Sequence, residues 1–130
     1  MVTPAYLLDS SVCVLLLRGR TGVAELPAPP EAGISAIVAA ELWAGAVKAK
    51  RARAVAALEQ LLDFFPVLDF TANATRVYGE IRADLEQRGQ SIGPLDLLIA
   101  AQARSLEATL VTRNARDFKR VNGLKVQAWK

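Results

Sequence analysis

Short apolar runs alternate along this chain with longer segments in which apolar residues recur every three or four positions. The short runs predict β-strands at residues 5–8, 33–35, 66–70, 108–112 and 124–129. The periodic segments predict helices at residues 10–18, 37–49, 51–64, 71–89 and 93–106. Strands that alternate with helices form parallel sheets with helices on both faces, because the crossover connections are right-handed. The pattern therefore predicts an α/β fold with a central, mostly parallel sheet.

Helix boundaries are marked by residues with clear local preferences. Pro66 ends the helix at 51–64, and Thr71 is placed to cap the helix after it. Gly89 provides a stop for that helix, and Gly93 with Pro94 opens the next one. These signals support the division into separate elements.

The composition is typical of one folded domain covering residues 1–130. Hydrophobic residues make up 52% of the chain and charged residues 22%, far from the composition of disordered segments. The apolar run at residues 12–17 is much shorter than the roughly 20 residues that span a bilayer. No basic residue precedes it, as a signal peptide requires. We therefore expect a cytoplasmic protein without a membrane partner.

Two residue types narrow the possible chemistry. The single cysteine, Cys13, lies in an apolar run, so it is predicted to be a core residue rather than part of a disulfide or metal site. Histidine is absent, which excludes serine–histidine and cysteine–histidine catalysis and zinc sites built on imidazole. An enzyme with this composition has to use carboxylates, with or without a hard metal ion.

Oxygen-bearing side chains follow the predicted strands. Asp9 comes directly after the first strand, and Glu41 lies in the helix after the second. Asp96 lies in the first turn of its helix, and Asn114 and Asp117 follow the strand at 108–112. Taken singly, each has an ordinary explanation as a turn, cap or surface residue. Together they lie where sites form in open parallel sheets, and such clustered carboxylates repel one another unless a cation such as Mg²⁺ or Mn²⁺ is bound.

Four blocks of sequence, in this order, resemble one protein family. They are "YLLDSSV", "SAIVAAELWAGAVK", "GEIRADLEQRGQSIGPLDLLIAAQA" and "TLVTRNARDFKRVNGLKVQAW", and together they extend over essentially the whole chain. The chain resembles the PIN-domain ribonucleases, and more closely the toxin halves of VapBC-type bacterial toxin–antitoxin pairs. The resemblance implies a three-layer α/β/α fold and a metal-dependent endoribonuclease site.

The resemblance also assigns individual positions. Asp9, Glu41 and Asp96 match the first, second and third acidic positions of the family. Asp117 matches the acidic position of the C-terminal block, and Asn114 occupies a nearby place where many PIN domains carry an aspartate. Asp9, Asp96 and either Glu41 or Asp117 are then expected to hold one or two Mg²⁺ or Mn²⁺ ions. Cleavage is expected to leave a 5′-phosphate and a 3′-hydroxyl.

The residues after Asp9 differ from a frequent family pattern. Ser10 supplies the hydroxyl that commonly follows the aspartate, whereas Ser11 replaces a frequent asparagine. We expect Ser11 to change the hydrogen bonds around the site more than metal binding itself.

Basic residues gather in two places and contribute to a formal net charge of +3. The first group is Lys48, Lys50, Arg51 and Arg53, and the second is Arg113, Arg116, Lys119 and Arg120. The second group lies beside the predicted fourth acidic position, so these four residues are candidates for contacts with RNA phosphates. A solvated surface explains the first group better. Trp43 and Trp129 are able to stack on bases, although packing is the favoured role for both.

Partners follow from the same resemblance. An RNA substrate, a cognate VapB-type antitoxin and homodimerisation are expected. The antitoxin would bind as a peptide over the apolar N-terminal helices and bring a basic side chain to the carboxylates.

Three other functions are considered. A haloacid-dehalogenase-type phosphatase needs a second aspartate two residues after the first, where this chain has Ser11. A receiver domain needs a lysine after the strand that here reads "TLVTRN". A catalytically silent PIN domain that binds RNA or protein remains as the alternative, and the three acids at the matching positions argue against it.

Overall fold

The computed structural model describes residues 3–129 and contains one five-stranded sheet with the order β3-β2-β1-β4-β5. The strands are β1 (Tyr6–Leu8), β2 (Ala32–Ser35), β3 (Val67–Leu68), β4 (Thr109–Thr112) and β5 (Lys125–Ala128). Every neighbouring pair in this sheet is parallel. The predicted parallel sheet is confirmed, and its carboxyl ends therefore meet along one edge.

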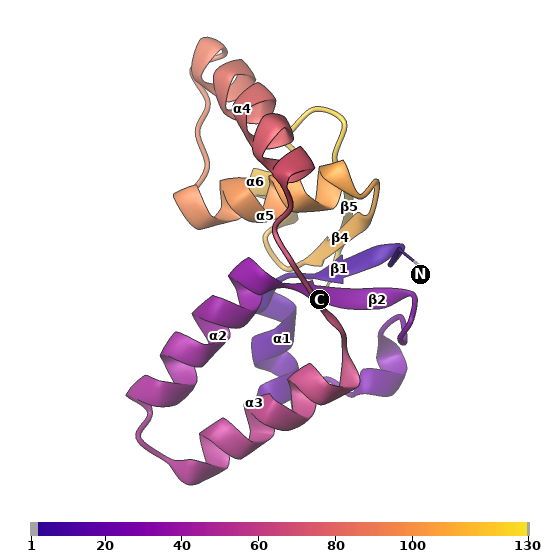
Figure 1. Ribbon diagram of the computed structural model, residues 1–130, viewed down its shortest axis with the longest axis vertical. Helices are drawn as coiled ribbons and strands as arrows, with labels where there is room; N and C mark the ends of the chain where they lie inside the picture. The colour runs from indigo at the N-terminus through magenta and orange to yellow at the C-terminus, as the bar shows by residue number, and fades with distance from the viewer. Residues whose placement is uncertain (1–2, 130) are drawn as a thin grey trace.

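Helices cover both faces of the sheet (Figure 1). The helices are α1 (Ser10–Leu17), α2 (Ala36–Lys48), α3 (Ala52–Phe64), α4 (Ala72–Gln87), α5 (Pro94–Ser105) and α6 (Ala115–Phe118), with a 3₁₀ turn η1 (Val23–Glu25). Helices α1, α2 and α3 lie on one side, and α4 and α5 lie on the other (Figure 1). The predicted three-layer α/β/α architecture is confirmed.

The helix boundaries follow the local signals in the sequence. The Thr71 hydroxyl accepts a hydrogen bond from the backbone N–H of Ala74, which caps α4. Gly89 follows α4 with φ of +67°, a conformation that favours glycine. Pro94 is the first residue of α5, where its missing N–H costs no hydrogen bond.

The core is formed by the apolar faces that the periodicity predicts. Leu58 of α3, Ile81 and Leu85 of α4, and Ile99 of α5 are all at most 2% exposed. Burying each such side chain contributes roughly 1.5–3 kcal/mol. Cys13 is also buried in α1, and burial raises the pKa of its thiol to about 12. The prediction of a core cysteine is confirmed, and a thiol with so high a pKa is unreactive at neutral pH.

The structure differs from the sequence prediction mainly at short elements. The strand expected at 66–70 is reduced to Val67–Leu68, an edge strand that pairs with β2 alone. Helix α6 was not predicted, because its four residues are too few to display helical periodicity. Across residues 3–129, every helix is too short or too polar to cross a bilayer.

Candidate active site

Asp9 lies at the carboxyl end of β1 and is the N-cap residue of α1. Its side chain is buried, with 3% of the residue exposed. Oδ2 accepts hydrogen bonds from the hydroxyl of Thr112 at 2.6 Å and from the hydroxyl of Ser11 at 3.0 Å. Oδ1 is also buried, and no described residue donates to it. One oxygen of this carboxylate is therefore fixed and the other is open to a ligand.

The two hydroxyl groups that hold Asp9 are themselves held by backbone N–H groups. Thr112 accepts from the N–H of Asn114 at 2.9 Å, and Ser11 accepts from the N–H of Arg113 at 3.0 Å. Each hydroxyl is thus oriented with its own proton toward Asp9. Ser11 takes part in the hydrogen bonding around the first acid, and a smaller effect on metal binding than on this bonding stays a prediction. The role of Thr112 was missed, although a threonine at the end of the strand "TLVT" was a visible signal.

The parallel register of β1 and β4 brings Asp9 and Thr112 together. Leu8 pairs with Val111, so the next residue of each strand lies at the same level of the sheet. The N–H of Asp9 donates to the carbonyl of Val111 at 2.9 Å, which extends the β1–β4 hydrogen bonding to the acid itself.

Glu41 projects from α2 and is half-buried. Its Oε1 is buried and receives no hydrogen bond from the described residues. Burial raises the pKa of Glu41, and the negative charges of Asp9 and Asp96 raise it further, whereas the Ser10 hydroxyl lowers it. Glu41 therefore shares one electrostatic environment with the other two acids, and Ser10 lies beside it.

Asp96 lies in the first turn of α5, with its carboxylate turned back toward the start of the helix. A Cβ placed on Gly93 would lie 3.7 Å from Asp96 Oδ2. Burial raises the pKa of Asp96, and the charges of Asp9 and Asp117 add to the effect. Asp96 therefore lies near Asp9 and Asp117, as Glu41 lies near Asp9 and Asp96.

A buried glutamine fixes α5 against the carboxyl edge of the sheet. The hydroxyl of Ser35 donates to Gln102 Oε1 at 2.6 Å, and Gln102 Nε2 donates to the carbonyls of Leu68 and Asp69 at 2.9 and 3.1 Å. Ser35 also accepts from the N–H of Ile37 and caps α2. Gln102 thereby connects α5, which carries Asp96, to β2, β3 and α2. No local pattern in the sequence marks Gln102 as part of the site.

Asp117 differs from the other acids because both of its oxygens have partners. Oδ2 accepts from Asn114 Nδ2 at 3.2 Å, and Oδ1 forms an ion pair with Arg120 at 3.4 Å. Asn114 and Asp117 therefore belong to one contact, on short helix α6 and its N-cap. Asn114 and Asp117 are the two candidates for the fourth position. Neither has a buried side-chain oxygen without a hydrogen-bond partner, as Asp9 does.

The predicted RNA-contact residues fall into two groups. Arg113, Arg116 and Lys119 are exposed. Arg120 is half-buried, pairs with Asp117, and donates from Nη1 to the carbonyl of Ser91 at 2.9 Å. Arg120 thus connects the segment that carries Asp117 to the loop that leads into α5. Contact of these four residues with RNA stays a prediction.

The donor set suits a hard divalent cation. It consists of carboxylates, and it includes two buried oxygens, Asp9 Oδ1 and Glu41 Oε1, without a hydrogen-bond donor in the described chain. Mg²⁺ and Mn²⁺ prefer such oxygen ligands and complete their shells with water. Within residues 3–129, however, no three His, Cys, Asp or Glu side chains converge as ligands of a single ion. The metal ligands stay a prediction that rests on the open oxygens.

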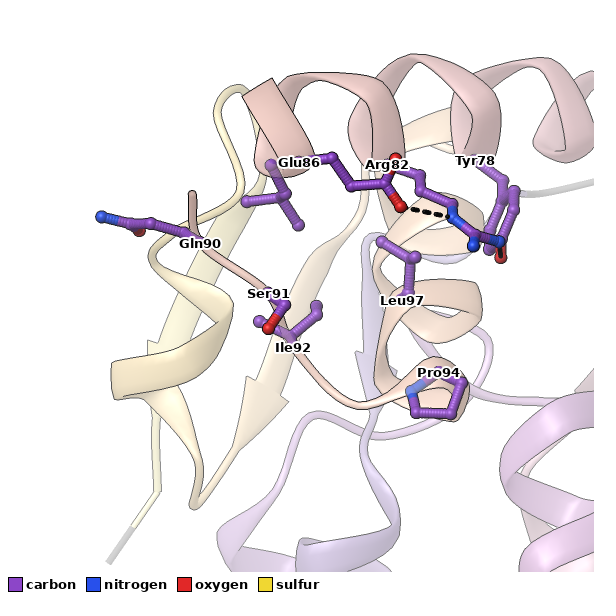
Figure 2. A pocket seen from close by; sticks show the side chains of 9 residues that line it. Tyr78, Arg82, Glu86, Gln90, Ser91, Ile92, Pro94 and Leu97 are labelled. Carbon is purple, nitrogen blue, oxygen red and sulfur yellow. Dashed lines mark hydrogen bonds and ion pairs between the residues drawn. The ribbon is translucent and has the colours of Figure 1, made fainter. Parts of the chain in front are cut away.

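Two cavities differ in their relation to the acids. A cavity of about 280 Å³ reaches Glu41 and lies among α1, α2 and α3; its lining is Val14, Leu17, Arg18, Glu41, Leu42, Gly45, Ala46, Ala54 and Ala57. A cavity of about 180 Å³ lies between α4 and the loop before α5 (Figure 2). Figure 2 shows Arg82 paired with Glu86, and Arg82 also donates to the Tyr78 hydroxyl at 3.0 Å. None of the predicted site residues lines this second cavity.

Comparison with known proteins gives a consistent result. The family model described as "PIN domain" matches residues 6–124. "Ribonuclease VapC2" of Rickettsia felis is 38% identical over 130 residues, which cover 95% of this chain and 97% of the relative. "tRNA(fMet)-specific endonuclease VapC" of Shigella flexneri is 34% identical over 128 residues, with 95% and 97% covered. A solved structure of VapBC2 from Rickettsia felis, bound to a DNA fragment from their promoter, superposes with a TM-score of 0.87 at 36% identity and covers 96% of this chain and 98% of that one.

Proposed function

We propose that this chain, which belongs to the PIN domain family, is a metal-dependent endoribonuclease and the toxin of a type II toxin–antitoxin pair. The observation that carries the proposal is the buried Asp9, whose Oδ1 is open beside Glu41 and Asp96 at the carboxyl edge of the sheet. Relatives at 34–38% identity are named as VapC ribonucleases or endonucleases. We place the activity in the cytoplasm, where RNA is available.

Asp9 and Glu41 would hold Mg²⁺ or Mn²⁺ through their open oxygens, together with Asp96. A bound divalent ion lowers the pKa of a coordinated water and neutralises charge on a phosphate. Thr112 and Ser11 keep the Asp9 carboxylate from rotating, because both donate to Oδ2. Asn114 and Arg120 restrain Asp117 in the same way.

Proton transfer falls to the carboxylates, since the chain has no histidine. A carboxylate oxygen of Glu41 or Asp96 that does not hold the ion would accept a proton from the attacking water. The water oxygen bonds to phosphorus as the bond from phosphorus to O3′ breaks. The 3′ oxygen takes a proton, and the products are a 5′-phosphate and a 3′-hydroxyl.

A VapB-type antitoxin is the proposed protein partner. The superposed Rickettsia felis structure is described as VapBC2. In this chain, the cavity among α1, α2 and α3 is largely apolar and ends at Glu41, with Gly45 and Ala46 leaving space for an inserted segment. We propose that an apolar segment of the antitoxin covers this cavity and directs a basic side chain toward Glu41. Homodimerisation remains part of the proposal.

The test is RNA cleavage by protein purified free of antitoxin. A mixed RNA pool is incubated with Mg²⁺, with Mn²⁺ or with chelator, and the ends of the products are mapped. Cleavage with either ion and 5′-phosphate ends are expected, whereas Asp96→Asn should be inactive. Asp63→Asn is a matched control, because Asp63 is exposed on α3.

Three outcomes would contradict the proposal. Cleavage in chelator, or cyclic phosphate ends, would exclude the carboxylate–metal mechanism. RNA binding without cleavage under every metal condition would instead support the silent PIN domain as an RNA-binding module.

A further inference from the structure

A cavity of about 830 Å³ lies beside the acid cluster, on the α1 side of β4 and β5. Its lining residues are Leu15, Arg20, Thr21, Glu25, Arg113 and Trp129. This volume lies in the range of roughly 300–1,000 Å³ that is typical of ligand pockets. None of the predicted acids lines this cavity, and it shares no lining residue with the cavity that reaches Glu41.

Two lining residues are bonded directly to the groups that hold Asp9. Arg113 follows Thr112 in the chain, and its N–H donates to the Ser11 hydroxyl at 3.0 Å. The N–H of Trp129 donates to the carbonyl of Thr112 at 2.8 Å. Ser11 and Thr112 both donate to Asp9, so the backbone of these two lining residues is bonded to the same residues that hold the proposed catalytic carboxylate.

The charged groups of the cavity favour an anion. Arg20 and Arg113 are exposed, and the side chain of neither forms an ion pair or hydrogen bond within residues 3–129. The acid of the cavity, Glu25, accepts a hydrogen bond from the Thr21 hydroxyl at 3.1 Å. Two guanidinium groups without a carboxylate partner are well suited to phosphate oxygens.

Trp129 adds a flat aromatic surface to these charges. The residue is half-buried, so part of it packs on the core while part remains accessible from the cavity. An aromatic ring beside arginines is the combination that binds single-stranded nucleic acid, because the ring stacks on a base while the arginines contact the backbone. An acidic peptide would use the arginines but would have less need of the indole.

We propose that Arg20, Arg113 and Trp129 form a subsite for one nucleotide of single-stranded RNA next to the cleaved phosphate. Trp129 stacks on the base, and the two arginines bind the adjoining phosphates. The subsite rests on the proposed ribonuclease function and adds to it a surface that positions the substrate. The sequence favours a packing role for Trp129, and the part of its side chain that contacts the core keeps that role.

Fluorescence of Trp129 tests the proposal directly. The parent protein carries Trp43→Phe, which leaves Trp129 as its single tryptophan, and Asp96→Asn with chelator to prevent cleavage. A mixed-sequence RNA decamer is titrated into this protein, and binding should quench or shift the emission. The Trp129 variants are compared by the fluorescence anisotropy of a dye-labelled decamer, because they carry no tryptophan. Removing the ring with Trp129→Ala should weaken binding roughly 5- to 150-fold, whereas Trp129→Phe should retain most of the affinity.

The arginines are tested by the salt dependence of binding. Arg20→Ala and Arg113→Ala should each weaken binding and reduce the slope of log K against log salt by about 0.7, the value for one phosphate contact on a single strand. Trp129→Ala should leave that slope unchanged, since stacking releases no counterion. Arg53→Ala, an exposed arginine on α3, is the matched control and should alter neither quantity.

The outcomes separate the subsite from the ribonuclease itself. The protein with Asp96 intact is first shown to cleave RNA with Mg²⁺. If all three subsite variants then bind RNA with normal affinity and unchanged salt slopes, the subsite alone is overturned. A parent that neither binds nor cleaves RNA would overturn both proposals. Weaker binding of a purified antitoxin, with RNA binding unaffected, would assign the cavity to an acidic peptide and would also overturn the subsite.

Discussion

The hydroxyl of Thr112 donates to Asp9 Oδ2 at 2.6 Å and joins two residues that are 103 positions apart in the sequence. The same hydroxyl accepts from the N–H of Asn114, so its proton is directed at the acid. This contact joins the ends of β1 and β4 and leaves Asp9 Oδ1 open.

Replacing Thr112 with valine keeps the shape of the side chain and removes the donor to Asp9. A hydrogen bond to a charged group contributes about 1.5–3 kcal/mol, so kcat for RNA cleavage should fall roughly 10- to 100-fold. Binding of RNA in chelator should be nearly unchanged, because Thr112 is buried. Thr109→Val on the same strand is the control. An unchanged kcat in Thr112→Val would show that the orientation of Asp9 does not limit the reaction.

The raised pKa values of Glu41 and Asp96 make the stability of the metal-free protein depend on pH. Their ordinary pKa values are 4.5 and 3.8, and both are higher in the folded chain. Above the ordinary values the folded state binds more protons than the unfolded state, so stability falls as pH rises through this window. Glu41→Gln and Asp96→Asn remove the effect. Both variants should therefore have a higher Tm than the wild type at pH 7 in chelator.

This gain should vanish in acid, where the wild-type carboxyls are also neutral. Thermal unfolding followed by circular dichroism from pH 3 to pH 8 measures it, with Glu59→Gln on the exposed face of α3 as the control. A lower Tm for both neutral variants at pH 7 would mean that the carboxylates stabilise the metal-free fold, contrary to the charge repulsion inferred here.

Adding a divalent cation should raise the Tm of the wild type, because the ion binds the folded state. Ligand at 100 times its Kd stabilises a protein by about 2.7 kcal/mol. Asp9→Asn should lose most of the rise given by Mn²⁺, and Asp63→Asn should keep it. Calorimetric titration with Mn²⁺ provides a second readout that does not depend on RNA. Equal rises in the wild type and Asp9→Asn would place cation binding elsewhere.

Replacing Gln102 with leucine should destabilise the fold more than an ordinary surface change. The substitution removes the partner of the Ser35 hydroxyl and leaves the carbonyls of Leu68 and Asp69 without their donor. A loss of about 2–4 kcal/mol in the free energy of unfolding is expected, measured in urea. Gln87→Leu, at the exposed end of α4, should cost less than about 0.5 kcal/mol.

Arg120 has two possible roles that one comparison separates. Its contacts with Asp117 and with the carbonyl of Ser91 predict that Arg120→Ala lowers kcat while the affinity for RNA in chelator stays the same. A phosphate contact predicts the reverse, a weaker affinity with a smaller salt slope. Lys119→Ala, which removes an exposed charge next to it, is the control for charge alone. We expect the first result, because the Arg120 guanidinium already has both partners.

The candidate site was predictable from the sequence as a set of acids but not as an arrangement. Asp9, Glu41 and Asp96 stand out because each follows a predicted strand or enters the next helix, and local patterns are enough to find such positions. Gln102 carries no such mark, and Thr112 is marked only by its place at the end of a predicted strand. Their roles depend on partners more than 30 positions away in the chain.

The sequence by itself determined the order of strands and helices along the chain, the core cysteine and the set of candidate carboxylates. These follow from hydrophobic periodicity, caps and composition, which act between near neighbours in the chain. The tertiary structure decided which oxygens are free. Asp9 Oδ1 and Glu41 Oε1 stay open, whereas Asp117 is paired with Asn114 and Arg120. That difference arises because hydrogen bonds form over about 3 Å, a distance that only the packing of separate elements sets.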